Sequence, residues 1–362
     1  MGFGALLVGA GFLSKNLCKE VLAAAFHEKE ARYYKKIDGE TVRCLLCPHQ
    51  CTLKNGQRSF CRVREPKEGK LYTLVYELPC SVHVDPIEKK PIYHMLPGSK
   101  SLSIATAGCN LRCKFCQNWQ ISQERPENTF ARYLPCNEVV KQAKVNNCRS
   151  IAYTYSEPTV FYEYMLDTAR IAKAQNIKNV WVTGGFINIE PLDELCGAID
   201  AANIDLKGFS DKYLSEVCSE RLEPLLATIK RAKEKGVWVE ITNLVVPTLN
   251  DDMYMIKDMC IWIKENLGTD TPLHFSRFWP MYKLKNLPPT PLETLRTAKK
   301  TATDCGLNFV YIGNVPEERS SDTYCPGCHK KLIQRVGYFV LGNNIVNSAC
   351  KFCGYKIAGI WT

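Results

Sequence analysis

The sequence lacks any hydrophobic run long enough to cross a membrane. Of its 362 residues, no apolar segment reaches the roughly 18–20 residues that a membrane-spanning helix needs. Residues 3–13 are apolar, but no basic residue precedes them, and an export signal has a basic start. We therefore expect residues 1–27 to be a leader, either disordered or weakly signal-like. We also expect a cytoplasmic protein with no membrane span.

Acidic residues are missing from the C-terminal segment 325–362, although the whole chain has 37 acidic and 47 basic residues and a net charge of +10. The basic residues of this segment are Lys330, Lys331, Arg335, Lys351 and Lys356. Such a tail could bind nucleic acid or an acidic protein surface, or it could simply be a solvated basic face. The second reading is the simpler one, so nucleic acid is not favoured as a partner.

Cysteine is the one unusual component of an otherwise ordinary composition. Hydrophobic residues make up 46% and charged residues 23%, which excludes a mainly disordered chain. Eleven of the 19 cysteines fall in three sets, namely Cys44, Cys47, Cys51 and Cys61; Cys109, Cys113 and Cys116; and Cys325, Cys328, Cys350 and Cys353. Gaps of two or three residues indicate metal ligation in a reducing compartment, whereas disulfide scaffolds are typical of short secreted chains.

From residue 100 onward, short β-branched runs alternate with helical patterns. We expect strands at 101–107, 150–155, 179–184, 201–206, 237–246 and 272–278, with a possible seventh at 308–313, and helices at 137–147, 158–175, 190–198, 222–235, 252–266 and 291–304. This alternation predicts an α/β fold with a parallel sheet, and six or seven units favour a partial (β/α)6-type TIM barrel over a doubly wound sheet. We expect this core at 101–319, after an N-terminal Cys-rich region at 28–100 and before a small metal module at 320–362.

The central cysteine set directly follows the first expected strand. The loop reads CNLRCKFC, with the spacing C-x3-C-x2-C. Three thiolates this close can bind three irons of a [4Fe–4S] cluster, and no fourth cysteine follows at a suitable spacing. One iron would then be open to another ligand. The alternative is a structural zinc site that takes a distant fourth ligand.

This motif resembles the signature of the radical S-adenosylmethionine (SAM) superfamily. The resemblance implies that Cys109, Cys113 and Cys116 hold a catalytic [4Fe–4S] cluster whose open iron binds SAM. It also implies an enzyme that reductively cleaves SAM, and that the resulting 5′-deoxyadenosyl radical abstracts a substrate hydrogen. The radical chemistry would belong to the cofactor, while the protein would supply orientation and exclusion of water.

Further segments are similar to the pyruvate formate-lyase activating enzyme-like branch of the superfamily. Tyr155-Ser156-Glu157-Pro158 stands where that branch has Gly-Gly-Glu-Pro, and Asp205-Leu206-Lys207 matches its DLK segment. The resemblance implies SAM contacts from Phe115, Gln117, Ser156, Glu157, Asp205, Lys207 and His274. Each residue also has a purely structural reading: Glu157 could be a helix N-terminal acid, Asp205 and Lys207 a surface ion pair, and His274 a core imidazole.

Over about residues 28–362 the sequence resembles the AmmeMemoRadiSam-system radical SAM enzyme family. The segments that carry the resemblance are CLLCPHQC, HVDPIEKKPIYHMLPGS, AGCNLRCKFCQNWQISQ, AYTYSEPTVFYEYMLDTA, IDAANIDLKGFSD, TNLVVPTLNDD, HFSRFWPMYK and the C-terminal CPGC and CKFCGYKIAGIW. Two segments depart from the family pattern. Gly184-Gly185-Phe186 replaces Asn-Gly-Tyr, which puts an asparagine contact near SAM in doubt, and Ser59 and Arg62 replace glycines beside Cys61. The family name implies Memo-type and AMMECR-domain partners, besides a reductant such as ferredoxin or flavodoxin.

The two outer cysteine sets predict further metal. The set Cys44, Cys47, Cys51 and Cys61 could hold zinc or a second iron–sulfur cluster, which would serve as an electron relay. The set Cys325, Cys328, Cys350 and Cys353 has zinc-ribbon spacing, and Gly342-Asn343-Asn344 is expected to form the turn between its halves.

Three alternatives to the general radical SAM reaction stay open at this point. The protein could activate a glycyl-radical enzyme by abstracting hydrogen from a protein backbone. It could modify RNA, with the basic C-terminal module on the phosphates. It could also be a non-catalytic iron–sulfur or zinc scaffold, which would bind metal without cleaving SAM.

Overall fold

The computed structural model of the chain describes residues 29–315 and 320–362. The leader predicted at 1–27 lies outside the described residues. Within these two ranges no helix is both long and apolar enough to cross a membrane.

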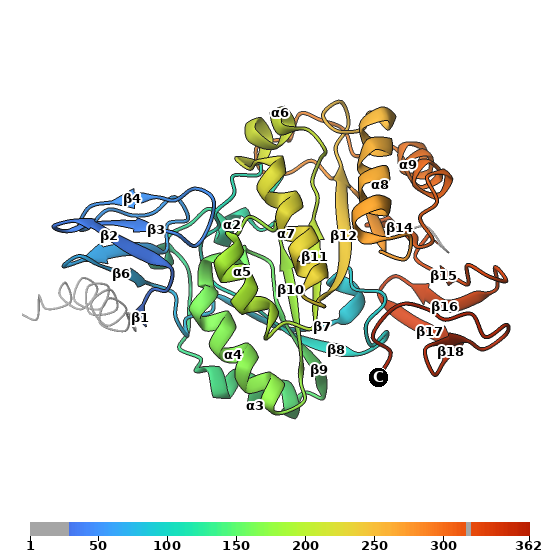
Figure 1. Cartoon of the computed structure of the whole chain (residues 1–362), viewed down its shortest axis with the longest axis horizontal. Helices are drawn as coiled ribbons and strands as arrows, with labels where there is room; N and C mark the ends of the chain where they lie inside the picture. The colour runs from blue at the N-terminus through green and yellow to red at the C-terminus, as the bar shows by residue number, and fades with distance from the viewer. Residues whose placement is uncertain (1–28, 316–319) are drawn as a thin grey trace, which may run out of the picture.

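An eight-stranded sheet forms the centre of the molecule (Figure 1). Its strands, in spatial order, are β14 (Val310–Gly313), β13 (Leu273–Arg277), β12 (Trp238–Val245), β11 (Ala201–Asp205), β10 (Lys178–Thr183), β9 (Cys148–Tyr153), β8 (Lys100–Ala105) and β7 (Ser81–Pro86). Strands β8 to β14 are parallel and follow one another in chain order. A doubly wound sheet reverses its strand order. The sequential order found here therefore agrees with the expectation that the sheet is not doubly wound.

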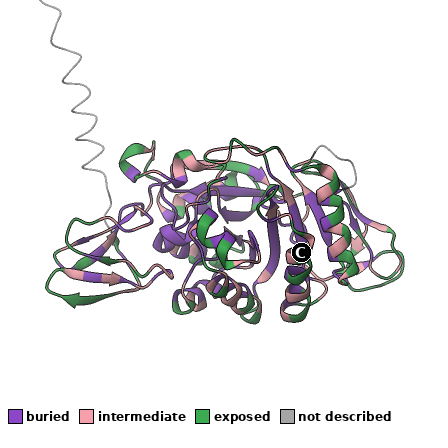
Figure 2. Ribbon diagram, turned by 90° about the horizontal axis from the view of Figure 1, so that it is seen from above, coloured by how far each residue is buried: buried purple, intermediate pink, exposed green. Residues whose placement is uncertain are grey.

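Each parallel strand is joined to the next through helical structure. The main helices are α3 (Cys136–Val145), α4 (Tyr162–Ala174), α5 (Ile189–Cys196), α7 (Leu222–Glu234), α8 (Met253–Leu267) and α9 (Leu292–Asp304). Short turns of helix are η1 (Ile87–Lys89), α2 (Trp119–Ser122), η2 (Pro126–Asn128), η3 (Pro158–Phe161), α6 (Asp211–Tyr213) and the π-helix η4 (Leu214–Cys218). Gly236 and Gly306 end α7 and α9 with positive φ, as their positions after the helical patterns predict. The strands are buried along most of their length, and the exposed residues lie on the outer helices and at the two ends (Figure 2).

The central sheet extends across the boundary expected at residue 100. Strand β7 lies in the supposed N-terminal region, yet it pairs antiparallel with β8 and forms one edge of the central sheet. The sequence reading missed this strand. Upstream of it lie two small antiparallel sheets: β1 (Lys29–Glu30), β6 (Lys70–Thr73) and β5 (Arg64–Lys67) form one, and β2 (Tyr34–Asp38), β3 (Thr41–Cys44) and β4 (Thr52–Leu53) form the other. Cys44 ends β3, and the other three N-terminal cysteines lie in the segments between the strands.

The C-terminal module lies at the opposite end of the molecule from the N-terminal sheets (Figure 1). It contains β15 (Thr323–Tyr324), β16 (Lys331–Val336), β17 (Phe339–Asn343), β18 (Ile345–Val346) and β19 (Ala349–Cys350). Its hydrophobic core is shared with the rest of the chain, because Tyr93, Phe309 and Tyr311 pack with Leu332 and Ile333. The module is therefore packed onto the central sheet rather than being a separate tail.

Two expectations about this module need correction. Gly342 and Asn343 do not turn the chain, because they lie inside β17 and pair with Gln334 and Ile333 of β16. The hairpin turns instead at Gly337, which has positive φ. The basic face is also smaller than the composition indicates: Arg335 is buried, with its guanidinium over Tyr93 and bonded to the Tyr93 carbonyl at 2.8 Å.

Candidate active site

The central cysteine loop begins where β8 ends, and backbone hydrogen bonds hold it in place. Arg112 N donates to Cys218 O at 2.7 Å, and Lys114 N donates to Val217 O at 2.9 Å, so the loop is attached to η4. The thiols of Cys109 and Cys113 are buried. Among the described residues, only the C-terminal set has ligand atoms that all lie within 4.8 Å of one another, so the three central sulfur atoms are more widely spaced.

Hydrogen-bond donors surround the three sulfur atoms. Leu111 N donates to Cys109 Sγ at 3.3 Å, and Ser122 Oγ lies 3.2 Å from Cys116 Sγ. A hydrogen bond with the Cys218 side chain lowers the pKa of Cys113. Metal ligation requires thiolates, and hydrogen bonds to the charged form stabilise it. Burial raises the pKa of Cys109 and of Cys116, so bound metal would have to stabilise their thiolates. The donor set itself fits iron–sulfur ligation.

Cys218 is a neighbour of the site that the sequence analysis did not find. It is the last residue of η4 and is fully buried beside Cys113. A π-helical turn carries an extra residue and is frequent at functional sites. The following Ser219 has positive φ, so the chain reverses sharply after this cysteine. Because Cys218 stands alone in the sequence, no spacing rule distinguishes it from the scattered structural thiols.

Glu157 connects the carboxyl ends of β9 and β10. Its Oε1 accepts from Thr159 N at 3.0 Å and from Thr183 Oγ1 at 2.6 Å, and its Oε2 accepts from Gly184 N at 2.7 Å. The first of these bonds caps η3, so the structural reading as a helix N-terminal acid holds. The other two place the carboxylate at the mouth of the sheet, where ligand-binding residues of parallel sheets lie.

Tyr155 and Ser156 form the turn before Glu157. Tyr155 has a φ of 65°, a conformation that favours glycine and that a bulky residue adopts only at a cost of roughly 1–3 kcal/mol. Its hydroxyl donates to the carboxylate of Asp85, which fixes the ring. Ser156 Oγ donates to Thr106 O at 2.8 Å and so joins this turn to the end of β8.

A buried cation and a buried acid stand next to the cysteine loop. Lys207 Nζ lies 3.8 Å from Glu220 Oε2 and 3.6 Å from Asp205 Oδ2. Within the described chain, neither Lys207 Nζ nor either Glu220 carboxylate oxygen has a hydrogen-bond partner. Unpaired buried polar groups are costly, so these atoms are suited to receive a polar ligand. Burial raises the pKa of Glu220 to about 8. Glu220 was also missed from the sequence, because it has no motif around it.

Gly184 shows how closely these groups approach one another. A Cβ atom at this position would lie 2.5 Å from Leu111 Cδ1, 2.9 Å from Lys207 Nζ and 3.4 Å from Glu157 Oε2. The cysteine loop, the acid after β9 and the cation after β11 therefore meet around this glycine. Any side chain here would fill the space between them, which gives a physical reason for glycine in place of the family asparagine.

The other three expected SAM contacts are His274, Phe115 and Gln117. His274 Nε2 lies 2.7 Å from Glu240 Oε2, and its ring packs against Tyr93 and Tyr311. None of its described contacts is with the cysteine loop or Lys207, so the core-imidazole reading describes it better. Phe115 is buried in the cysteine loop, and Gln117 is exposed just after it.

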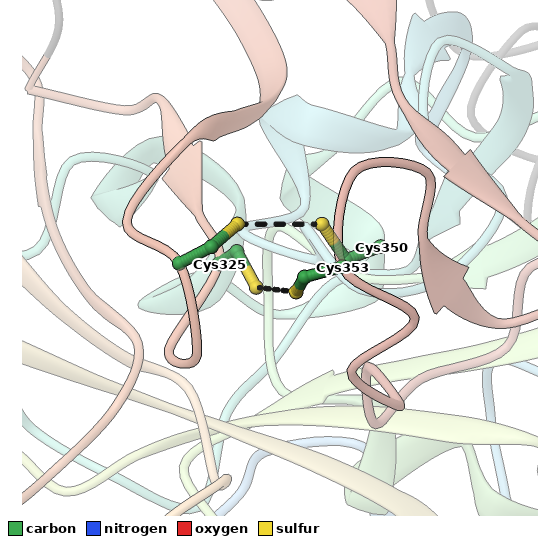
Figure 3. Close-up of side chains that lie close together, drawn as sticks. Cys325, Cys350 and Cys353 are labelled. Atoms are coloured by element: carbon green, nitrogen blue, oxygen red, sulfur yellow. Dashed lines mark hydrogen bonds between the residues drawn. The ribbon is translucent and has the colours of Figure 1, made fainter.

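The C-terminal cysteines form a compact group of four sulfur atoms (Figure 3). Cys325 Sγ lies 3.6 Å from Cys353 Sγ, and Cys328 Sγ lies 3.7 Å from Cys350 Sγ. Four sulfur ligands at about 2.3 Å from one zinc ion stand about 3.8 Å apart in a tetrahedron. The donor set and its spacing therefore fit a single tetrahedral metal ion.

Comparisons with known proteins identify the class to which this site belongs. Residues 103–259 match the radical SAM superfamily. The chain is 23% identical over 171 residues to the pyruvate formate-lyase-activating enzyme of Clostridium pasteurianum, which covers 46% of this chain and 71% of that protein. Among solved structures, the chain is similar to a radical SAM methyltransferase from Sphaerobacter thermophilus. The match covers 85% of this chain and 83% of that protein, with 14% identity and a TM-score of 0.49. The protein is an enzyme of the radical SAM class.

A much closer relative defines the family within this class. An uncharacterized protein of Methanocaldococcus jannaschii is 47% identical over 334 residues, which cover 91% of this chain and 98% of that protein. This chain belongs to the same family of radical SAM proteins.

Proposed function

We propose that the protein reductively cleaves SAM at a [4Fe–4S] cluster and uses the 5′-deoxyadenosyl radical to abstract a hydrogen atom from a substrate. The observation that carries this proposal is that the cysteine loop, through Leu111, meets the Glu157 carboxylate and the buried Lys207 cation around Gly184. Lys207 and the neighbouring buried acid Glu220 lack hydrogen bonds within the described chain. Cys109, Cys113 and Cys116 would bind three irons. When bound, the cluster supplies the electron that breaks the S–C5′ bond of SAM.

The residues around the cysteine loop match the polar groups of SAM. Lys207 would pair with the SAM carboxylate, because it is a buried cation without a hydrogen bond. The acids of the site, Glu157, Asp205 and Glu220, would face its amino group, sulfonium and ribose hydroxyls. Ser156 would hold the turn that presents Glu157. Phe115 and Gln117 stay in the proposal as neighbours of Cys116, and we leave His274 out because of its bond with Glu240.

A protein is the substrate class that we favour. A relative from Clostridium pasteurianum is named as a pyruvate formate-lyase-activating enzyme, which supports hydrogen abstraction from a protein backbone and a ferredoxin- or flavodoxin-type reductant. The AmmeMemoRadiSam assignment adds Memo-type and AMMECR-domain proteins as proposed partners. RNA is disfavoured, because Arg335 is buried and Lys331 Nζ pairs with Asp322 at 2.8 Å. The partial-barrel description, zinc at the C-terminal ribbon and a cytoplasmic location belong to the same proposal.

Anaerobic reconstitution tests the proposal directly. The full chain, loaded with iron and sulfide, is mixed with dithionite and SAM, and 5′-deoxyadenosine and methionine are quantified by mass spectrometry. We expect both products from the native sequence and neither from the triple variant Cys109→Ala, Cys113→Ala, Cys116→Ala. Cys305→Ala, a half-buried thiol outside the three sets, serves as the control. A loaded cluster that yields no 5′-deoxyadenosine would contradict the proposal. Deuterium transfer from a captured partner protein into 5′-deoxyadenosine would then identify the substrate.

A further inference from the structure

The N-terminal cysteines form a group whose geometry differs from that of the C-terminal zinc-type group. Cys44, Cys47 and Cys61 are buried, and Cys51 is half-buried. Electrostatic interactions connect Cys44 with Cys47, Cys51 and Cys61, and Cys61 with Cys47 and Cys51. The four thiols thus face a common space. In the described chain, however, no three of these sulfur atoms lie together within 4.8 Å, in contrast to the C-terminal set.

The central set likewise does not bring its three sulfur atoms within 4.8 Å of one another. A single tetrahedral zinc brings its sulfur ligands to about 3.8 Å from one another. In a cubane cluster each of four irons takes its own thiolate, so the four thiolates stand further apart than the ligands of a single ion. In the described chain, the C-terminal cysteines therefore form one compact set, and the other two sets lack three sulfur atoms within 4.8 Å of one another. In this respect the N-terminal quartet resembles the cluster-binding set of the active site.

The local contacts are also those of a thiolate site. Phe60 N donates to Cys51 Sγ at 3.5 Å, and Ser59 Oγ lies 3.1 Å from Cys61 Sγ. Burial raises the pKa of Cys44 and of Cys61, and the charge of buried Arg64 opposes that rise. His49, the other candidate ligand in this segment, donates its Nε2 hydrogen to Asn110 O at 2.8 Å, so this nitrogen is not free to bind metal. We take the four thiols as the proposed ligand set.

The quartet lies directly against the catalytic cysteine loop. A Cβ on Gly108 would lie 2.6 Å from the Cys61 carbonyl oxygen, which shows how closely the two backbones approach. Asn110, the residue after Cys109, accepts a hydrogen bond from His49 Nε2 at its backbone carbonyl oxygen, 2.8 Å away. Arg112 donates to Cys109 O at 2.9 Å and also to Phe60 O, so its guanidinium connects the two loops.

From this arrangement we propose that Cys44, Cys47, Cys51 and Cys61 bind a second [4Fe–4S] cluster, through which electrons reach the catalytic cluster. The inference rests on the proposed function, because it assigns an electron donor to that site. A one-electron protein reductant of the ferredoxin or flavodoxin type would reduce the second cluster beside half-buried Cys51. The electron would cross where the two loops approach each other at Cys61 and Gly108. It would be consumed in the cleavage of SAM to methionine and the deoxyadenosyl radical, so that one electron enters for each SAM cleaved.

Metal analysis of the reconstituted full chain tests the ligand assignment. We expect about eight irons and eight sulfides per chain, since each [4Fe–4S] cluster contains four of each. The triple variant of Cys109, Cys113 and Cys116 should keep about half of both, and a Cys44→Ala, Cys61→Ala variant should keep the other half. Cys80→Ala, a half-buried thiol of the same region, should keep all. The proposal would be overturned if the triple variant of Cys109, Cys113 and Cys116 held zinc but no iron at the N-terminal set, or bound no metal there. This result is decisive even if the Cys44→Ala, Cys61→Ala variant fails to fold.

A comparison of reductants tests the electron path and separates this proposal from the proposed function. With dithionite, which is small and diffusible, the Cys44→Ala, Cys61→Ala variant should still cleave SAM. With reduced flavodoxin its rate should fall at least tenfold, whereas Cys80→Ala should match the native chain. Equal rates with flavodoxin would overturn the relay. Loss of SAM cleavage in the native chain itself would reject the proposed function, while the iron count would still report on the second cluster.

Discussion

Lys207 Nζ lies 3.8 Å from Glu220 Oε2 in a buried position, and neither group has a hydrogen bond from the described part of the chain. Because burial raises the pKa of Glu220 to about 8, the two groups attract each other as opposite charges only where this acid is ionised. The hydrogen-bonding capacity of the Lys207 ammonium and the Glu220 carboxyl group is unused. A buried pair of this kind is weak support for stability, because desolvation offsets the attraction. Its position beside Cys113 and Gly184 points instead to ligand binding.

Replacing Lys207 tests this reading. In Lys207→Met we expect SAM to bind about tenfold more weakly or worse, since a hydrogen bond to a charged group contributes roughly 1.5–3 kcal/mol. Glu220→Gln keeps the side-chain shape and should weaken SAM binding in the same direction. Isothermal titration with the reconstituted chain measures the Kd, and thermal unfolding checks that the variants fold. Lys212→Met, at an exposed lysine of α6, is the control. An unchanged Kd in both site variants would remove the pair from the SAM site.

Gly184 allows a steric test of the same site. Gly184→Ala should displace Leu111 and Lys207, because the new Cβ would lie 2.5 Å and 2.9 Å from their side chains. Overpacking of this kind typically costs 1–3 kcal/mol, so we expect formation of 5′-deoxyadenosine to fall roughly tenfold or more. Gly313→Ala is a matched control at a strand end, with no atom within 4 Å of its added Cβ. Full activity of Gly184→Ala would mean that the three groups need not meet there.

The sequence predicted the regular elements of this fold well and its irregular ones poorly. Strands β8 to β14 and their helices follow from periodicity, because each buries one face against the next unit. β7 escaped notice because an antiparallel edge strand has no helix beside it to complete a repeat. Glu157 and Lys207 were found through family motifs. Cys218 and Glu220 were not, because only the π-turn of η4 brings them to Cys113. The SAM contact of His274 was implied by the family resemblance, and nothing in the sequence indicated its partner Glu240, whose Oε2 lies 2.7 Å from His274 Nε2.

A buried ion pair attaches the N-terminal strand β5 to helix α4 of the central unit. Arg64 donates to both oxygens of Glu163 at 2.7 and 2.8 Å, and both side chains are 1% exposed. Arg64→Met would leave the Glu163 carboxylate buried without its partner. We expect the free energy of unfolding, measured with urea, to fall by about 3–5 kcal/mol. Lys300→Met removes an exposed pair with Asp304 and should cost roughly 0.5 kcal/mol or less. If the two variants lost similar amounts of free energy of unfolding, burial of the Arg64–Glu163 pair would not determine its contribution to stability.

The C-terminal cysteines should bind a single zinc ion. The sulfur separations of 3.6 and 3.7 Å fit one tetrahedral ion. Purified protein should therefore contain about one zinc per chain, measured by inductively coupled plasma mass spectrometry. Cys328→Ser together with Cys350→Ser should lose it and lower the Tm, because the small module has little core of its own. Cys305→Ser should keep both zinc and Tm. Iron in place of zinc at this set, in protein whose other sets are mutated, would contradict the assignment.

His94 should make the protein sensitive to mild acid. Its Nδ1 donates to Ala358 O at 2.8 Å, so the neutral ring must accept the Tyr311 hydroxyl at Nε2, 2.7 Å away. Burial lowers the pKa of His94 to about 4. Between the ordinary value near 6.5 and this value, the unfolded chain binds a proton that the folded chain does not, so the free energy of unfolding falls as pH falls.

We expect this one group to remove about 2 kcal/mol of stability between pH 7 and pH 5, on the scale of 1.36 kcal/mol for each pKa unit. Urea unfolding at the two pH values measures the loss. His94→Asn keeps a donor for the Ala358 carbonyl but cannot be protonated, so its stability should depend less steeply on pH by that amount. His83→Asn makes the same change at an exposed histidine and should leave the native slope. A slope in His94→Asn equal to that of the native chain would show that another group is responsible for the acid sensitivity.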